Sequence, residues 1–317
     1  MKTLAGATLT GLGVHRPALY LDNALIAERI GSSDEWIRER SGIVTRGVSA
    51  DDESVVDMGA EAGAKAIAAS GVDPADIGLV LLATCSMPGP LPGGSPELAH
   101  RLGTTNAGAA DVGAGCAGFA YAVGLAADTV RAGTAEHVLV VGSEKLTPII
   151  DPDDRGTAFL FGDGAGAVVV SRSETDTIGP VRWLHDGDQW NKLVIAGEPK
   201  RRLSMEGRAV FRWATTRMPD LCRRACDAAG VALEDLKAFV PHQANERITD
   251  SVVAKLGLPE TVAIARDIRD SGNTSAASVP LALARLVELG EVSRGDAALL
   301  VGFGAGLTAA AQVVHVP

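Results

Sequence analysis

The chain has 317 residues, of which 46% are hydrophobic and 21% charged, and its formal net charge at neutral pH is −10. This composition indicates a folded globular protein with a large core and argues against disorder. Without a run of Lys and Arg, the acidic chain has no broad basic surface for nucleic acid, and no apolar stretch reaches the ~18 residues of a membrane span. Its first residues lack the apolar segment of a signal peptide, so we expect a soluble cytoplasmic protein.

Two parts of the chain repeat one pattern of elements. Segments 64–84 and 223–243 each read as a helix, a glycine stop, an acidic turn and a buried strand. A glycine corner follows in each half, at 162–166 and at 302–306, and leads into an apolar stretch. Alternating helices and short β-branched runs predict an α/β fold, and an internal duplication explains both pairs. Neither corner is a dinucleotide fingerprint, because neither opens a helix; the glycines more simply let two backbones approach closely.

The four cysteines do not form a disulfide framework in a chain of this size. Cys222 and Cys226 have the spacing of neighbouring turns of one helix, but no histidine or further cysteine lies near them in the sequence to complete a zinc site. We interpret both as packing residues.

Cys116 lies in the segment 111–119, which reads Asp-Val-Gly-Ala-Gly-Cys-Ala-Gly-Phe. A predicted buried helix follows through Arg131 and stops at Gly133. Cys116 is therefore expected at a helix start, where unpaired amides and the helix dipole stabilise a thiolate and lower the thiol pKa. Taken alone, a free cysteine is more often an inert core residue.

His242 and Asn273 are the other two candidates for chemistry. His242 follows the predicted strand 238–240, at a strand end of the kind where α/β active sites gather. Asn273 lies in the small-residue loop 271–278, which admits an amide without bulk. Alone, the histidine could be a core residue and the asparagine a turn former. Together with Cys116 they supply a nucleophile and two hydrogen-bond donors for a developing oxyanion, as carbon–carbon bond formation between thioesters requires.

A set of motifs in chain order carries a family resemblance. They are Ser-Asp-Glu-Trp-Ile at 33–37, the cysteine loop, Asp-Arg-Gly-Thr at 154–157, Phe-Gly-Asp-Gly-Ala-Gly at 161–166, His-Gln-Ala-Asn at 242–245, Gly-Asn-Thr-Ser at 272–275 and Gly-Phe-Gly-Ala-Gly at 302–306. Through them the chain resembles, over nearly its whole length, β-ketoacyl-acyl-carrier-protein synthase III of the thiolase superfamily, and its actinobacterial members most closely. The resemblance implies a thiolase-like duplicated αβαβα layered fold. The cysteine would lie in an N-terminal half, residues 1–171, and the histidine and asparagine in a C-terminal half, residues 172–317.

The resemblance also implies a reaction, a decarboxylating Claisen condensation. Cys116 would accept the acyl group of an acyl-CoA primer, with the N–H groups of Cys116 and Gly306 as oxyanion hole. His242 and Asn273 would hold the thioester carbonyl of malonyl-acyl-carrier protein while CO2 leaves, and the enolate would attack the acyl-cysteine. The resemblance implies no metal or redox cofactor. The partners would be acyl-CoA, malonyl-acyl-carrier protein and a second copy in a homodimer, without nucleic acid or membrane.

Binding residues are implied in the same way. Trp36 and Arg155 match the pair that sandwiches the adenine of CoA, and Arg40 matches a phosphate contact. The walls of the pantetheine tunnel are matched by Gly207, Phe211, Ala244 and Asn245. Basic positions that face the acidic carrier protein are matched by Arg212, Arg247 and Lys255, although any surface helix can carry such charges.

The departures from the family pattern concern the primer. Leu91 stands where many members have a phenylalanine that closes the acyl pocket across the dimer interface, and it lies in the Gly- and Pro-rich segment 88–94. The segment between Leu184 and Leu203 is shorter than the usual loop. We therefore expect a primer larger than acetyl.

Other functions share part of this pattern. A cysteine peptidase also uses Cys, His and Asn in this chain order, but the duplicated architecture argues against one. A thiolase would place a second cysteine at the C-terminal glycine corner, where Phe303 stands. A non-catalytic scaffold is disfavoured because the triad is intact. An acyltransferase of the same fold, which moves the acyl group from CoA to a carrier, hydroxyl or amine without condensation, remains the alternative. The acyl group, and the choice between fatty-acid and polyketide synthesis, remain open.

Overall fold

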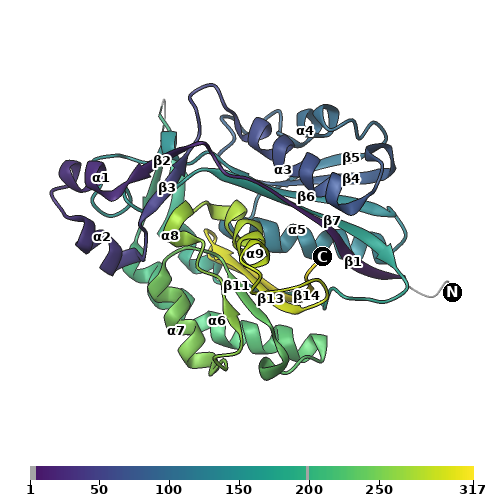
Figure 1. Ribbon diagram of the computed structural model, residues 1–317. Coiled ribbons are helices and arrows are strands. Elements are labelled where there is room, and N and C mark those ends of the chain that lie inside the picture. The colour runs from purple at the N-terminus through teal and green to yellow at the C-terminus, as the bar shows by residue number, and fades with distance from the viewer. Residues whose placement is uncertain (1–4, 198–199) are drawn as a thin grey trace.

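The computed structural model describes residues 5–197 and 200–317, and within them the main architecture is two five-stranded sheets with helices on their faces (Figure 1). The first sheet has the order β1-β7-β6-β4-β5, with β1 (Gly6–His15), β4 (Ile77–Ala83), β5 (Gly108–Val112), β6 (His137–Glu144) and β7 (Gly164–Ser173). The second has the order β12-β11-β13-β14-β8, with β8 (Arg182–His185), β11 (Ala238–Pro241), β12 (Ala263–Ile264), β13 (Ala297–Gly304) and β14 (Thr308–His315).

The two sheets have the same topology. Reading the second sheet from β8 gives β8-β14-β13-β11-β12, which corresponds strand for strand to β1-β7-β6-β4-β5. In both, the first three neighbouring strands pair antiparallel and the last three pair parallel. The predicted duplicated α/β fold is confirmed.

Helices and sheets alternate in five layers. The outer face of the first sheet is covered by α3 (Val55–Ser70) and α4 (Ser95–Arg101). Between the sheets lie α5 (Gly118–Arg131) and α9 (Ser278–Glu288), and beyond the second sheet lie α6 (Gly207–Ala229) and α7 (Glu246–Leu256). Three hydrophobic clusters fill the spaces between the layers, so the central strands of each sheet are buried on both faces, as their continuous Val, Leu and Ala runs require.

Smaller elements flank the layers. A lobe of β2 (Leu19–Asp22), α1 (Asn23–Arg29), α2 (Asp34–Ser41) and β3 (Thr45–Val48) extends to the left in Figure 1. The remaining helix and hairpin are α8 (Ile268–Ser271) and the pair β9 (Leu193–Ala196) and β10 (Arg202–Met205). The 3-10 turns are η1 (Pro74–Asp76), η2 (Gly115–Ala117), η3 (Thr147–Ile149), η4 (Gly187–Lys192), η5 (Leu233–Asp235) and η6 (Ser275–Ala277). Part of the short segment between β8 and β10, residues 198–199, lies outside the described residues.

The predicted helix stops are confirmed. Gly71 ends α3 and Gly230 ends α6, with φ of 72° and 66°, in the left-handed conformation that glycine adopts without a Cβ clash. β7 of the first sheet ends at Ser173, and β8 of the second sheet begins at Arg182. In the described part of the chain, no helix combines the length and apolar character that crossing a membrane requires.

Candidate active site

Cys116 lies in η2, the turn that leads directly into α5, so its predicted place at a helix start is confirmed. The residue is 7% exposed. Burial raises the pKa of the thiol to about 12, an effect that a hydrogen bond with Ser275 partly offsets and the charge of Glu144 reinforces. The expectation of a lowered pKa is therefore wrong for this structure, because loss of solvent around the sulfur outweighs the helix start. The resting nucleophile is a thiol.

The C-terminal glycine corner packs against the cysteine loop. A Cβ atom on Gly302 would lie 2.9 Å from the Cα of Ala117, closer than real Cβ contacts. This confirms the predicted close approach of two backbones at that corner. Gly306, in the turn between β13 and β14, has φ of +131°, and it is not among the described residues that line the cavity below.

His242 directly follows β11 and is 2% exposed. Its Nδ1 lies 2.7 Å from the Oγ of Ser278, and that hydroxyl accepts a hydrogen bond from the N–H of Gln243 at 3.3 Å. The hydroxyl proton can therefore point to Nδ1, which leaves an N–H on Nε2. Burial lowers the pKa of His242 to about 3, so the imidazole is neutral at pH 7.

Asn273 is held by its backbone and by its side-chain oxygen. Its N–H donates to the carbonyl of Leu160 at 2.8 Å, and its carbonyl accepts from the N–H of Gly162 at 3.1 Å. Its Oδ1 accepts from the N–H of Ser275 at 2.9 Å. The carboxamide is thereby oriented with its Nδ2 left for another acceptor.

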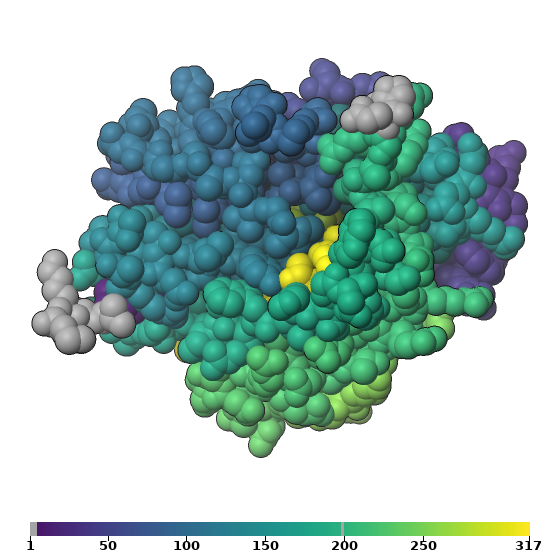
Figure 2. Space-filling model, turned by 180° about the vertical axis from the view of Figure 1, so that it is seen from behind, coloured from purple at the N-terminus to yellow at the C-terminus, as the bar shows by residue number. Residues whose placement is uncertain are grey.

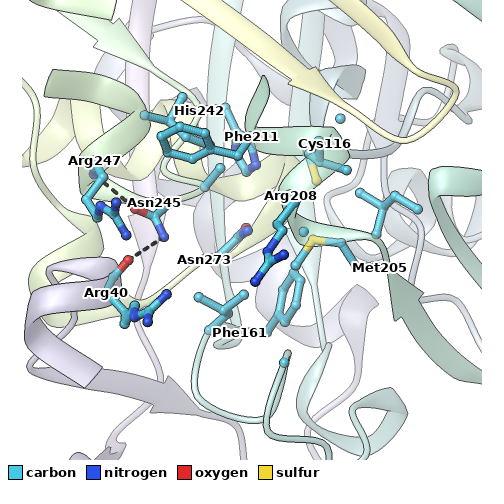
Figure 3. Close-up of a pocket in the computed structure, with 18 of the residues that line it drawn as sticks. Arg40, Cys116, Phe161, Met205, Arg208, Phe211, His242, Asn245, Arg247 and Asn273 are labelled. Carbon is cyan, nitrogen blue, oxygen red and sulfur yellow. Dashed lines mark hydrogen bonds between the residues drawn. The ribbon is translucent and has the colours of Figure 1, made fainter. Parts of the chain in front are cut away.

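One cavity of about 850 Å³ brings the three candidates together. Cys116, His242 and Asn273 all line it, and they come from η2, from the end of β11 and from the loop before η6 (Figure 3). Figure 2 shows the C-terminal segment at the bottom of a hollow between the N-terminal half and the teal and green segments of the C-terminal half.

The expected CoA-binding residues all line this cavity; they are Trp36, Arg40, Arg155, Gly207, Phe211, Ala244 and Asn245. Two of the expected carrier-protein residues, Arg212 and Arg247, line it as well. The third, Lys255, lies outside, and its Nζ donates to the carbonyl of Thr215 at 2.8 Å. Leu91 also lies outside, with 87% of its surface exposed.

Trp36 lines the cavity and is flanked by two arginines. The guanidinium carbons of Arg155 and Arg40 lie 5.1 and 5.3 Å from its ring centroid, in cation–π contact. A purine stacked between Trp36 and Arg155 needs about 3.5 Å on each side, roughly 7 Å in total. Arg155 must therefore move outward for an adenine to enter.

Some residues at the site carried no sequence signal strong enough to single them out. Arg208 lines the cavity and extends into it in Figure 3, and its only signal was its place beside Gly207. Glu144, the last residue of the apolar strand β6, and Cys85, two residues after the apolar strand β4, lie behind the cavity wall and were also missed. Among the described residues, no group of three or more His, Cys, Asp and Glu side chains is placed to hold a metal ion.

A duplicated α/β fold with Cys, His and Asn at one cavity is that of a thiolase-fold condensing enzyme. Comparison with known proteins gives the family. Models of 3-oxoacyl-[acyl-carrier-protein] synthase III and of its C-terminal domain match residues 110–187 and 226–316. β-Ketoacyl-[acyl-carrier-protein] synthase III of Streptomyces glaucescens is 50% identical, over 98% of this chain and 96% of that protein.

Solved structures agree. The priming β-ketosynthase of the R1128 polyketide biosynthetic pathway superposes with a TM-score of 0.97 at 43% identity, covering 100% of this chain and 98% of that one. The 3-oxoacyl-[acyl-carrier-protein] synthase III of Aquifex aeolicus has a TM-score of 0.93 at 35% identity, with 98% and 100% covered. The chain belongs to the β-ketoacyl-[acyl-carrier-protein] synthase III family.

Proposed function

We propose that Cys116, His242 and Asn273 are the catalytic residues of a decarboxylating condensation. The enzyme is a transferase of the synthase III family, which joins an acyl-CoA primer to malonyl-acyl-carrier protein and so begins a fatty-acid or polyketide chain. The observation that carries the assignment is that these three side chains, from distant parts of the sequence, line one cavity. Coenzyme A takes part as the thioester substrate, and the reaction calls for no other cofactor.

The first half-reaction transfers the acyl group to Cys116. The sulfur attacks the thioester carbonyl, a carbon–sulfur bond to Cys116 forms, the bond to CoA breaks, and the thiol proton ends on the departing CoA. The N–H groups of Cys116 and Gly306 would stabilise the oxyanion. Trp36 and Arg155 would clamp the adenine and Arg40 would bind phosphate, while Gly207, Phe211, Ala244 and Asn245 would line the pantetheine.

The second half-reaction forms the carbon–carbon bond. The malonyl thioester oxygen accepts hydrogen bonds from Nε2 of His242 and Nδ2 of Asn273 as CO2 leaves, and the enolate carbon attacks the acyl-cysteine carbonyl. Both donors are neutral and buried, so they stabilise the developing negative charge in a site with little competing water. The carbon–sulfur bond to Cys116 then breaks, and the departing thiolate takes up a proton from solvent, which restores the thiol.

The carrier protein and a second copy of the chain are the proposed macromolecular partners. Arg212 on α6, with Arg247 and Lys255 on the neighbouring α7, would present positive charge to an acidic carrier. A homodimer is supported by β5, an exposed edge of the first sheet that pairs only with β4 among the described strands. Such an edge has unpaired N–H and C=O groups that a second copy can satisfy.

Intact-protein mass spectrometry with a panel of acyl-CoAs tests the assignment. The stable mass gain identifies the primer. Cys116→Ala should abolish this mass gain, whereas Cys226→Ala, at a buried position of α6, should retain it. Addition of malonyl-acyl-carrier protein should then yield a β-ketoacyl carrier and release CO2. Transfer of the intact acyl group to the carrier without CO2 would establish the acyltransferase instead.

A further inference from the structure

Glu144 is a buried carboxylate that the reaction described above does not use. It is the last residue of β6 and is 0% exposed. In the described part of the chain, all of its hydrogen bonds come from neutral groups. Burying a carboxylate costs folding free energy unless hydrogen-bond donors surround it. The segments that supply these donors therefore indicate the role of Glu144.

Donors on two segments converge on the Glu144 carboxylate. The hydroxyls of Thr84 and Ser86 donate at 3.0 and 2.6 Å. Cys85 donates through its N–H at 3.1 Å and its thiol at 3.3 Å. The N–H of Ala276 donates at 3.4 Å from η6. The carboxylate thus joins the end of β4 to the turn that follows Asn273.

The hydroxyl oxygens of Thr84 and Ser86, which lie 3.3 Å apart, also accept hydrogen bonds from the backbone. The oxygen of Thr84 accepts from the N–H of Ser86 at 3.2 Å, and the oxygen of Ser86 accepts from the N–H of Lys145 at 2.9 Å. Each hydroxyl proton is therefore available to Glu144. The carboxylate oxygens of Glu144 therefore act as acceptors for all of these neighbours.

The turn that Glu144 contacts is strained. Ser275 has φ of +49°, a left-handed conformation that a residue with a side chain seldom adopts and that persists only where its surroundings hold it. Its N–H orients the carboxamide of Asn273, and its Oγ lies 3.6 Å from the sulfur of Cys85. A Cβ atom on Gly142 would lie 2.7 Å from the carbonyl oxygen of Ala276, so β6 presses directly against this turn.

We propose that Glu144 is a positioning residue for the condensation step, which holds the turn at Ser275 and Ala276 so that the Asn273 amide faces the cavity. The proposal rests on the proposed role of Asn273. Two hydrogen bonds from neighbouring residues link Glu144 to Asn273. The N–H of Ala276 donates to Glu144, and the N–H of Ser275 donates to the side-chain oxygen of Asn273. Without the carboxylate, the side-chain amide of Asn273 should no longer point correctly into the cavity.

Glu144→Gln tests the proposal, because glutamine has one acceptor oxygen and turns an NH2 group toward donors. We expect condensation with malonyl-acyl-carrier protein to fall about 10- to 100-fold, the size of effect that a small misplacement produces, while acylation of Cys116 should fall by less than about threefold, since removing the charge of Glu144 lowers the pKa of the thiol. The matched control is Glu136→Gln, at an exposed carboxylate paired with Arg172 at 2.8 Å, which should leave both steps unchanged.

A double-mutant cycle separates positioning from a general loss of structure. In the Asn273→Ala background, Glu144→Gln should cause no further loss of condensation, since the group it positions is absent. An equal loss in both backgrounds, or an equal loss of acylation and condensation, would overturn the proposal. If the glutamine variant does not fold, Ser86→Ala, which removes one donor, must show the same selective loss of condensation at smaller size. A wild-type enzyme that does not condense would instead count against the proposed function.

Discussion

Gly304 lies directly against Cys116: a Cβ atom built on Gly304 would be 2.8 Å from the Cβ of Cys116 and 3.1 Å from its sulfur. The contact joins β13 of the second sheet to the nucleophile turn of the first half. The position of the sulfur in the cavity therefore depends on the absence of a side chain on the opposing strand.

Gly304→Ala should displace the Cys116 side chain. We expect the rate of acylation to fall by about 100-fold, because the sulfur no longer meets the thioester carbon correctly, and the free energy of unfolding to fall by about 1–3 kcal/mol from overpacking. Time-resolved mass gain with acyl-CoA and urea unfolding measure the two effects. Gly187→Ala is the control, since its nearest neighbouring atom would lie 3.8 Å away, on His185. An alanine variant that acylates at the wild-type rate would show that this contact does not position the sulfur.

Asn273→Ala should separate the two half-reactions. It removes one of two donors to the malonyl thioester oxygen, so condensation should fall about 10²- to 10³-fold, while the first acyl transfer should change only a few-fold. Single-turnover acylation and overall product formation, measured on the same preparation, give both numbers. Asn191→Ala, at an exposed asparagine of η4, should change neither. Equal losses in the two steps would contradict the proposed division between Cys116 and Asn273.

The sequence predicted the catalytic residues but not the residues that hold them in position. Cys116, His242 and Asn273 lie within short local motifs at helix starts, strand ends and small-residue loops. Such motifs can be recognised from the sequence alone. The contact of Glu144 with residues 84–86 and Ala276 joins three distant segments, and it depends on how β4, β6 and η6 pack. The pKa of Cys116 was mispredicted for the same reason: its local helix start was visible, whereas burial by the opposite half was not.

The low pKa of His242 makes stability depend on pH. The unfolded chain protonates this histidine near pH 6.5, whereas burial lowers the pKa in the folded protein to about 3. Between these values the unfolded chain binds a proton that the folded chain does not, so this group's contribution to stability is complete above pH 6.5 and is lost as the pH falls toward 3.

His242→Gln should remove that dependence. Between pH 7 and pH 4, the variant should lose roughly 3 kcal/mol less unfolding free energy than the wild type, from about 1.4 kcal/mol for each pH unit below 6.5. Urea unfolding at a series of pH values measures the difference. His100→Gln, at an exposed position of α4, should retain the wild-type dependence. Parallel curves for His242→Gln and wild type would mean that the imidazole is not held neutral by burial.

The primer preference should depend on Leu91. In the synthase III family, a phenylalanine from the partner subunit closes the acyl pocket of many members. Here the shorter Leu91 stands at that position and is 87% exposed on the single chain, where a second copy can contact it. We expect a deeper pocket that favours primers larger than acetyl, with a graded preference because one methylene is worth only about 1–3 kcal/mol. Leu91→Phe should shift kcat/KM toward acetyl-CoA across acetyl-, butyryl-, isobutyryl- and hexanoyl-CoA. Leu289→Phe, on a leucine that is 62% exposed after α9, should not. If the wild type prefers acetyl-CoA, or if Leu91→Phe leaves the profile unchanged, the depth of the pocket is set by residues other than Leu91.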